Sequence, residues 1–259
     1  MAQPPATIRI LHVDDEPDFA ELAATFLEQE DDRFEVETTT SASEALDALA
    51  AGEYDCVVSD YDMPETDGIE FLVAVRNEHP TLPFILFTGM GSEEIASDAL
   101  AAGVTDYLQK GTGTDQYAVL ANRLVNAVER WRAQRAVEET KAQLEAITEH
   151  STDAIVTIDA DSRIRFANPA VEDLFGYDPG ELRGTSLTRL MPGRLQDDHQ
   201  AAVERHLQTG ERTVDWTGVE FPARHRSGAE FRISISFGSF EQSGERRFVG
   251  VIRDVSGAD

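Results

Sequence analysis

Five short apolar runs alternate with helical patterns over the first half of the chain. The apolar runs have the length of β-strands and cover residues 8–13, 34–38, 56–59, 83–88 and 106–108. Apolar residues at helical spacing cover 17–28, 42–51, 69–78, 93–102 and a long stretch from 116. Five successive strand–helix units predict a parallel sheet with helices on both faces. In such sheets, ligands bind outside the carboxyl ends of the strands.

Polar side chains suited to metal and phosphoryl chemistry follow four of these runs. They are Asp14, Asp15, Asp60, Asp62, Thr88 and Lys110. A single acid in such a place is commonly a helix cap, but caps alone do not explain the whole set. Acids gathered at one edge repel one another unless a hard cation such as Mg²⁺ neutralises them. A carboxylate beside that cation can attack phosphorus, while Lys110 and Thr88 would contact the oxygens of the transferring group.

Residues 116–149 contain neither proline nor glycine, which predicts one long helix. Apolar residues recur along it at coiled-coil spacing, first from Leu120 to Trp131 and again from Val137 to Ile147. We expect a helical connection between two domains that also pairs two chains. The alternative is a helix that ends the first domain, followed by an unrelated short one.

The last part of the chain predicts an α+β domain with one five-stranded antiparallel sheet. Strands are expected at 154–159, 164–167, 213–221, 230–237 and 247–255. Helices are expected within 169–175, 180–191 and 196–208. The length of 259 residues fits two domains of this size.

The chain is strongly acidic, with a formal net charge of −27 and only two lysines, Lys110 and Lys141. This charge would repel a polyphosphate backbone, so direct nucleic-acid binding is not expected. An excess of acids with few lysines resembles the composition of proteins from salt-loving microbes. Such a charge is tolerated in molar salt, because the Debye length falls to about 3 Å and repulsion between the acids is screened beyond that distance. No stretch reaches the ~20 apolar residues of a membrane span and no signal peptide precedes the first strand, so we expect a cytoplasmic protein. Cys56 is the single cysteine, which excludes a disulfide framework.

Four segments give the first domain a specific resemblance to a known family. They are ILHVDDEP (10–17), VVSDYDMPETDG (57–68), FILFTG (84–89) and DYLQKG (106–111). Over residues 7–130 the chain resembles the receiver domain of two-component response regulators. The resemblance implies a flavodoxin-like, doubly wound, five-stranded parallel sheet.

Carried over residue by residue, the resemblance makes Asp60 the phosphoacceptor. The Mg²⁺ ligands that it implies are Asp14 through water, Asp15, Asp60 and the backbone carbonyl of Asp62. The implied residues for phosphoryl contact and switching are Thr88, Lys110 and Tyr107. A core tyrosine is the alternative for Tyr107. The family usually has proline after the lysine, and Gly111 stands there instead, which suggests a looser loop.

The second domain, over residues 151–256, resembles a PAS sensory domain and follows a helical linker at 131–150. The matching segments are 153–184, LMP (190–192), 226–236 and 248–255. Haem is one candidate ligand, because His199 follows LMP at the spacing of the axial histidine in haem-binding PAS domains. However, Val219 stands where those sensors carry an arginine, and a structural histidine is the alternative. A flavin stacked on Trp216 is a further candidate, although packing on the sheet fits that residue better.

These resemblances imply a cytoplasmic phosphoacceptor without a kinase core, which loses its phosphoryl group slowly by itself. The expected partners are a sensor histidine kinase, a downstream signalling protein and a second copy of the chain, paired through the linker helix and the PAS domain. Alternatives are a scaffold that senses a ligand without phosphorylation and the N-terminal part of a longer hybrid histidine kinase. A remote alternative is an aspartate-nucleophile phosphatase, because Asp60 and Asp62 form a D-x-D pair.

Overall fold

The computed structural model describes residues 7–89, 93–111, 113–209 and 217–257. The chain divides after Glu139 into two compact units. Within the described ranges, no helix is long and apolar enough to cross a membrane.

The first unit contains a five-stranded parallel sheet in the order β2-β1-β3-β4-β5. Its strands are β1 (Ile8–Val13), β2 (Phe34–Thr39), β3 (Cys56–Ser59), β4 (Phe84–Thr88) and β5 (Asp106–Gln109). The helices are α1 (Pro17–Glu30), α2 (Ala42–Ala51), α3 (Gly68–Glu78), α4 (Glu93–Ala101) and α5 (Asp115–Glu149). The predicted α/β fold is therefore confirmed, with strand bounds close to those expected from the apolar runs.

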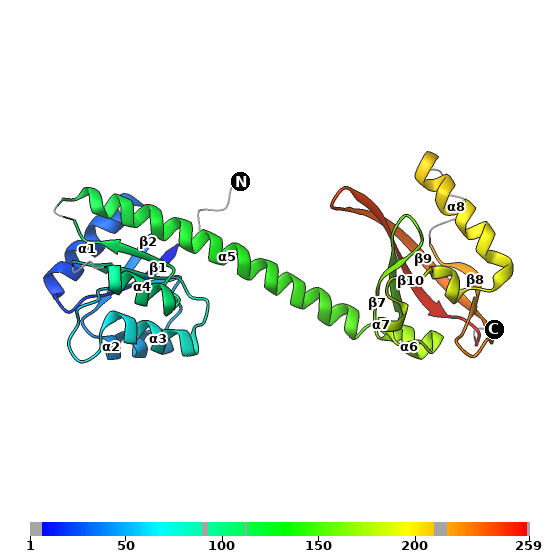
Figure 1. Ribbon diagram of the computed structural model, residues 1–259, viewed down its shortest axis with the longest axis horizontal. Helices are drawn as coiled ribbons and strands as arrows, with labels where there is room; N and C mark the ends of the chain where they lie inside the picture. Colours follow the sequence, from blue (N-terminus) through cyan, green and yellow to red (C-terminus); the bar gives the residue numbers. More distant parts are fainter. Residues whose placement is uncertain (1–6, 90–92, 112, 210–216, 258–259) are drawn as a thin grey trace. The chain divides into compact units, whose positions relative to one another are not determined.

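Both faces of this sheet are covered, because alternate residues of each strand point to opposite sides. Leu11 and Val13 pack in one core with α2 and α3, whereas Ile8 and Ile10 pack in the other with α1 and α5. Figure 1 shows these two helical layers on opposite sides of the sheet. Because both faces of the sheet are buried, the polar residues predicted to form the site lie at the ends of the strands.

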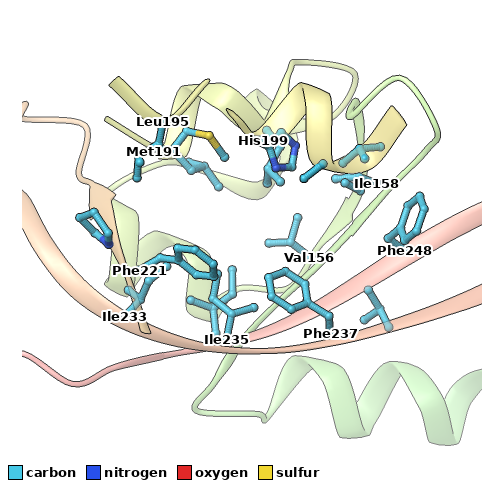
Figure 2. Close-up of a pocket in the computed structure, with 18 of the residues that line it drawn as sticks. Val156, Ile158, Met191, Leu195, His199, Phe221, Ile233, Ile235, Phe237 and Phe248 are labelled. Carbon is cyan, nitrogen blue, oxygen red and sulfur yellow. The ribbon is translucent and has the colours of Figure 1, made fainter. Parts of the chain in front are cut away.

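The second unit is an antiparallel sheet in the order β7-β6-β10-β9-β8, as predicted for the α+β domain. Its strands are β6 (Ala154–Ile158), β7 (Ile164–Ala167), β8 (Val219–Arg224), β9 (Glu230–Gln242) and β10 (Glu245–Asp254). Its helices are α6 (Ala170–Phe175), α7 (Pro179–Leu182), the 3₁₀ turns Leu187–Leu190 and Gly193–Leu195, and α8 (Gln196–Thr209). A pocket lies between α8 and the sheet (Figure 2).

Three predicted elements of this unit differ from the structure. The strand expected at 230–237 is β9, which continues to Gln242. The helix expected within 180–191 ends at Leu182, because Gly184 has a φ of 80° and Ser186 caps a separate 3₁₀ turn. The strand expected at 213–221 is β8, which runs on to Arg224; residues 213–216 lie outside the described ranges. Pro222 is accommodated because β8 is an edge strand with a single neighbour.

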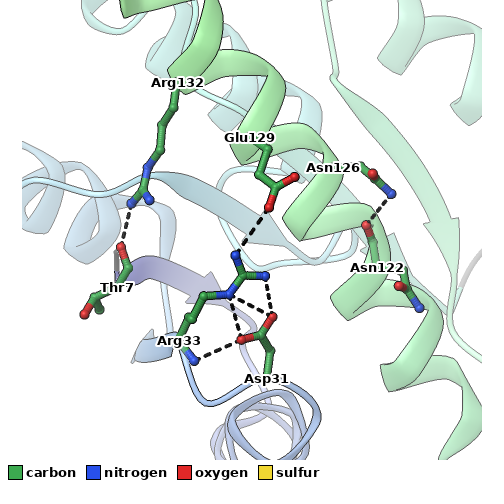
Figure 3. A network of polar contacts seen from close by, with 7 residues as sticks. All are labelled: Thr7, Asp31, Arg33, Asn122, Asn126, Glu129 and Arg132. Atoms are coloured by element: carbon green, nitrogen blue, oxygen red, sulfur yellow. Dashed lines mark hydrogen bonds and ion pairs between the residues drawn. The ribbon is translucent and has the colours of Figure 1, made fainter. Parts of the chain in front are cut away.

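The helix α5 is one continuous helix, which rules out the alternative of two separate helices. Its first turns are fixed to the first unit by buried Leu120, Leu124 and Val128. Polar contacts extend this attachment (Figure 3): Arg132 donates to the carbonyl of Thr7, and Glu129 accepts from Arg33 at 3.3 Å. Residues 133–147 that follow are all exposed.

At its other end, α5 is tied to the second unit by Asn168, whose side chain is 1% exposed. The Asn168 Nδ2 donates to the carbonyls of Thr148 and Asp153, both at 3.0 Å, and Oδ1 accepts from the Ile155 amide at 2.7 Å. One side chain thus joins the last turn of α5 to the first strand of the sheet.

We expect Asn168→Asp to destabilise the second unit by about 3 kcal/mol, because a carboxylate cannot donate to two buried carbonyls. The measurement is hydrogen exchange of peptides from β6 and β7 in increasing urea. Asn126→Asp is the matched control, since the exposed Asn126 donates only to Asn122 within α5. Equal exchange in both variants would contradict this role of Asn168.

Candidate functional site

The strand order brings the predicted site residues of the first unit to one edge of its sheet. Hydrogen bonds continue past the strand ends there. The Asp14 amide donates to the Thr39 carbonyl at 3.1 Å, and the Asp60 amide donates to the Val13 carbonyl at 2.8 Å. These backbone hydrogen bonds therefore fix the positions of Asp14 and Asp60 just after the ends of β1 and β3.

Three carboxylates meet at this edge. Oxygen atoms of Asp14, Asp15 and Asp60 all lie within 4.8 Å of one another. Asp14 is 1% and Asp60 8% exposed, while Asp15 is half-buried. Asp60 Oδ1 is buried without a hydrogen bond. Since a hexacoordinate Mg²⁺ takes oxygen ligands at about 2.1 Å, the three carboxylates present oxygens at separations that suit ligands of one such cation.

Lys110 supplies the positive charge within this cluster. Its Nζ lies 2.7 Å from Asp14 Oδ2 and 3.3 Å from Asp60 Oδ1. The ammonium group also lies 4.2 Å from the ring centroid of Phe19 and 5.8 Å from that of Phe87. Two ring faces and two carboxylates therefore hold the ammonium in place.

The loop after Lys110 is tied down more firmly than Gly111 suggested. The Lys110 amide donates to the Thr88 carbonyl at 2.8 Å, and the Gly111 amide donates to Gln116 Oε1 at 2.7 Å. All peptide bonds of the described residues are trans. The lysine thus reaches the acids without the usual proline.

The remaining predicted residues of this edge differ in burial. Asp62 is exposed, two residues after Asp60, whereas Thr88 at the end of β4 is completely buried. Tyr107 on β5 is half-buried and packs against the core beneath α3 and α4. Its position is compatible both with a switching aromatic residue and with a core tyrosine.

Two further residues shape the site and were missed from the sequence. His12 on β1 is completely buried, and this burial lowers its pKa to about 4, so the ring is uncharged at neutral pH. Gly68 begins α3 where an added Cβ would come within 2.3 Å of the Asp60 carbonyl oxygen. Gly68 therefore allows α3 to start against the Asp60 loop. The motif contains this glycine, but only the close approach of the backbone shows why.

In the second unit, His199 on α8 lines the pocket, and its Nε2 lies 3.0 Å from Ser162 Oγ. Burial lowers the pKa of the His199 ring. Val219 begins β8, while Trp216 lies outside the described residues.

Comparison with known proteins now identifies the two parts. Residues 10–129 match the family model of the response regulator receiver domain, and residues 148–258 match that of the PAS fold. The chain carries a receiver domain followed by a PAS fold. The receiver is the parallel α/β unit with the acidic edge, and the PAS fold is the antiparallel unit with the pocket.

Curated relatives match the receiver half. The nitrogen assimilation regulatory protein NtrX of Azorhizobium caulinodans is 34% identical over 51% of this chain and 28% of its own length. The response regulator SaeR of Staphylococcus aureus is 30% identical over 48% of this chain and 54% of its own length. The chain thus spans about half the length of SaeR and about a quarter of the length of NtrX.

Solved structures cover each half. A receiver domain protein from Clostridium thermocellum is 27% identical, with a TM-score of 0.44, over 49% of this chain and 98% of its own. The PAS domain of an HTR-like protein from Haloarcula marismortui is 28% identical, with a TM-score of 0.40, over 48% of this chain and 98% of its own.

The two lysines form a matched pair for testing the electrostatics of the site. Lys110→Met should lower the free energy of unfolding of the receiver by about 3 kcal/mol, because it leaves buried carboxylates without their cation. Lys141→Met should have little effect, since Lys141 is exposed and lies 3.7 Å from Glu145 on the surface of α5. Urea unfolding in the presence of EDTA measures both, and equal stabilities would show that Lys110 does not compensate the acids.

Proposed function

We propose that this chain acts in two-component phosphorelay signalling and accepts a phosphoryl group on Asp60 from a sensor histidine kinase. The observation that carries the proposal is Asp60 itself. It is a nearly buried carboxylate whose Oδ1 accepts no hydrogen bond and lies 3.3 Å from the Lys110 Nζ, beside two further acids in a receiver domain. The limits proposed for the parts are 7–130 for the receiver, 131–150 for the linker and 151–256 for the PAS domain.

Asp15, Asp60 and the Asp62 carbonyl would hold Mg²⁺ directly, and Asp14 would act through water. Bound there, the cation would neutralise carboxylate and phosphoryl oxygens. In the transfer, an Asp60 oxygen forms a bond to phosphorus as the bond from phosphorus to the donor's nitrogen breaks. The Lys110 ammonium, 3.3 Å from Asp60 Oδ1, then pairs with the new charge. The buried Thr88 hydroxyl contacts a phosphoryl oxygen.

The signal leaves the site through Thr88, Tyr107 and α5. Lys110 and Thr88 are joined by a backbone hydrogen bond, so movement at the phosphoryl group reaches β4 and β5 together. The loop after Lys110 is bonded to Gln116 on α5. This helix ends at the PAS sheet, and from there a downstream signalling protein is engaged. The chain is then a phosphoacceptor that loses its phosphoryl group slowly, and not a kinase.

Phosphoryl acceptance is tested with acetyl phosphate, Mg²⁺ and intact mass measurement in molar KCl. Wild type should gain one phosphoryl group, and Asp60→Asn should gain none because the nucleophile is lost. Asp62→Asn is the matched control: the proposed ligand at this position is the backbone carbonyl, so this variant should still be modified.

Modification of Asp60→Asn would place the phosphoryl group elsewhere. An unmodified wild type would contradict the proposal and leave ligand sensing by the PAS domain as the signal. Loss of modification in Asp62→Asn would show that its side chain, and not its carbonyl, takes part.

We also infer that two chains pair in parallel through the exposed part of α5. Val137, Leu144 and Ile147 are 63%, 58% and 59% exposed and recur at coiled-coil spacing with Thr140 between them. The flanking positions of this seam carry no acid; they are Gln134, Ala136, Lys141, Gln143 and Thr148. The acids lie on the outer positions as Glu138, Glu139, Glu145 and Glu149.

This distribution favours a second copy as the occupant of the seam. In a parallel pair, flanking positions of one helix face those of the other, so like charges there would repel. A chain with a net charge of −27 that keeps acids out of these positions removes that repulsion.

Leu144→Glu should convert the paired chain to single chains at micromolar concentration, because it buries a carboxylate in the seam. Ala146→Glu adds the same charge at an exposed outer position of the same helix and should leave the pair intact. Sedimentation velocity in molar KCl measures both. A wild type that sediments as a single chain, or equal dissociation of both variants, would exclude pairing through this seam.

A further inference from the structure

Phe19 on α1 lies beside the acidic edge of the receiver sheet, where its ring covers one side of the Lys110 ammonium. Lys110 Nζ is 4.2 Å from the centroid of this ring and 5.8 Å from that of Phe87, so Phe19 is the nearer of these two rings. Phe19 is half-buried and packs at the margin of the core, whereas Phe87 is completely buried. The Phe19 ring can therefore be changed with less effect on the core than the Phe87 ring.

The position of Phe19 follows from the way in which α1 begins. The Glu16 amide donates to Asp14 Oδ1 at 3.1 Å, and the Phe19 amide donates to the Glu16 carbonyl at 3.0 Å. The other oxygen of the same carboxylate, Asp14 Oδ2, lies 2.7 Å from Lys110 Nζ. One acid thus binds both the start of α1 and the ammonium, which brings a side chain from the first turn of α1 next to Lys110.

The ammonium lies closer to Asp14 than to the proposed phosphoacceptor. Lys110 Nζ is 2.7 Å from Asp14 Oδ2 and 3.3 Å from Asp60 Oδ1. Three carboxylates and one ammonium leave two negative charges at this edge, which one Mg²⁺ would balance. With a divalent cation there, the attraction between Lys110 and the acids is weaker, because the two cations repel each other. The ion pairs alone therefore hold Lys110 least firmly when the metal is bound.

The ring of Phe19 supplies an attraction of a different kind. A cation near a ring face is attracted by the quadrupole of the ring, which carries no net charge for a metal ion to balance. The ammonium has three hydrogen-bond donors, and contact with a ring face does not use them up. Lys110 can therefore turn its donors from Asp14 toward a phosphoryl oxygen on Asp60 without leaving the ring.

We propose that Phe19 is a positioning residue for phosphoryl acceptance, whose ring face keeps the Lys110 ammonium within reach of Asp60 while Mg²⁺ balances the charge of the acids. This role rests on the proposed function of Asp60, and Phe19 acts in it only through Lys110. Loss of the ring should slow phosphoryl acceptance even when the acids, the lysine and the fold are unchanged.

Phe26 provides a matched control on the same helix. It lies seven residues after Phe19 on α1, is also half-buried and packs against the same core. Its ring stacks on that of Tyr117, with centroids 4.9 Å apart, whereas the Phe19 ring contacts Lys110. Phe26→Leu therefore removes a comparable ring from the same core and leaves the contact of Lys110 in place.

The rate of phosphoryl acceptance is measured by intact mass over time, with the full chain, acetyl phosphate and Mg²⁺ in molar KCl. Phe19→Leu should be labelled about fivefold more slowly than wild type, and Phe26→Leu at the wild-type rate. Phe19→Tyr keeps a ring face and should restore the wild-type rate. Pentafluorophenylalanine at position 19 has nearly the shape of phenylalanine but a face that repels cations, so it should be labelled as slowly as Phe19→Leu.

The two lysines allow a second measurement that needs no phosphoryl transfer. Because the chain contains only Lys110 and Lys141, ¹³C labelling at the lysine Cε gives one NMR signal for each. Ring current shifts protons held over an aromatic face to lower frequency, so the Lys110 protons should lie below those of the exposed Lys141, with and without Mg²⁺. Phe19→Leu should move the Lys110 signal toward that of Lys141, and Phe26→Leu should leave it in place.

Equal labelling rates of wild type and Phe19→Leu, equal slowing in Phe19→Leu and Phe26→Leu, or an unshifted Lys110 signal in wild type would each overturn the role of Phe19. These outcomes leave phosphoryl acceptance at Asp60 standing, whereas a wild type that gains no phosphoryl group would contradict both. If Phe19→Leu fails to fold, as judged by circular dichroism, pentafluorophenylalanine and Phe19→Tyr are compared instead. Equal rates of these two proteins would likewise overturn the role.

Discussion

The receiver half depends on the confinement of three carboxylates at one edge of a parallel sheet. Asp14 and Asp60 are almost fully buried, and their oxygens lie within 4.8 Å of one another and of Asp15. Such proximity is unfavourable in a low-dielectric setting unless positive charge lies close by. Lys110 provides one charge, held by Phe19, Phe87 and the tied loop that follows it. The remaining excess of negative charge makes this edge receptive to a divalent cation.

The long helix α5 has two physically different parts. Its first part is buried against the receiver sheet and fixed by the contacts of Glu129 and Arg132. The part after Arg132 exposes all residues from 133 to 147. A helix whose side chains are exposed over several turns gains little from propensity alone. Pairing with a second copy would supply the missing burial along Val137, Leu144 and Ile147.

Much of the fold could be predicted because the apolar runs were strong and regularly spaced. The five strands of the receiver could be predicted from the length and spacing of the apolar runs. The single helix α5 could be predicted from the absence of proline and glycine. The PAS domain was harder, since its short elements are ended by local backbone geometry. Gly184 with positive φ and the Ser186 cap divide what hydropathy alone predicts to be one helix. Edge position, which allows Pro222 within β8, is likewise a tertiary property.

By itself, the sequence determined which residue types stand at the strand ends, because each follows an apolar run directly along the chain. Only the tertiary structure decided how those side chains meet. The burial of His12 and the two aromatic rings around Lys110 depend on segments that are distant in sequence. The same holds for the PAS pocket, whose walls come from both ends of that domain. The spacing of apolar residues indicates which face of a helix or strand is buried. It does not indicate which residues of other segments pack against that face, and the chemistry of both sites depends on those residues.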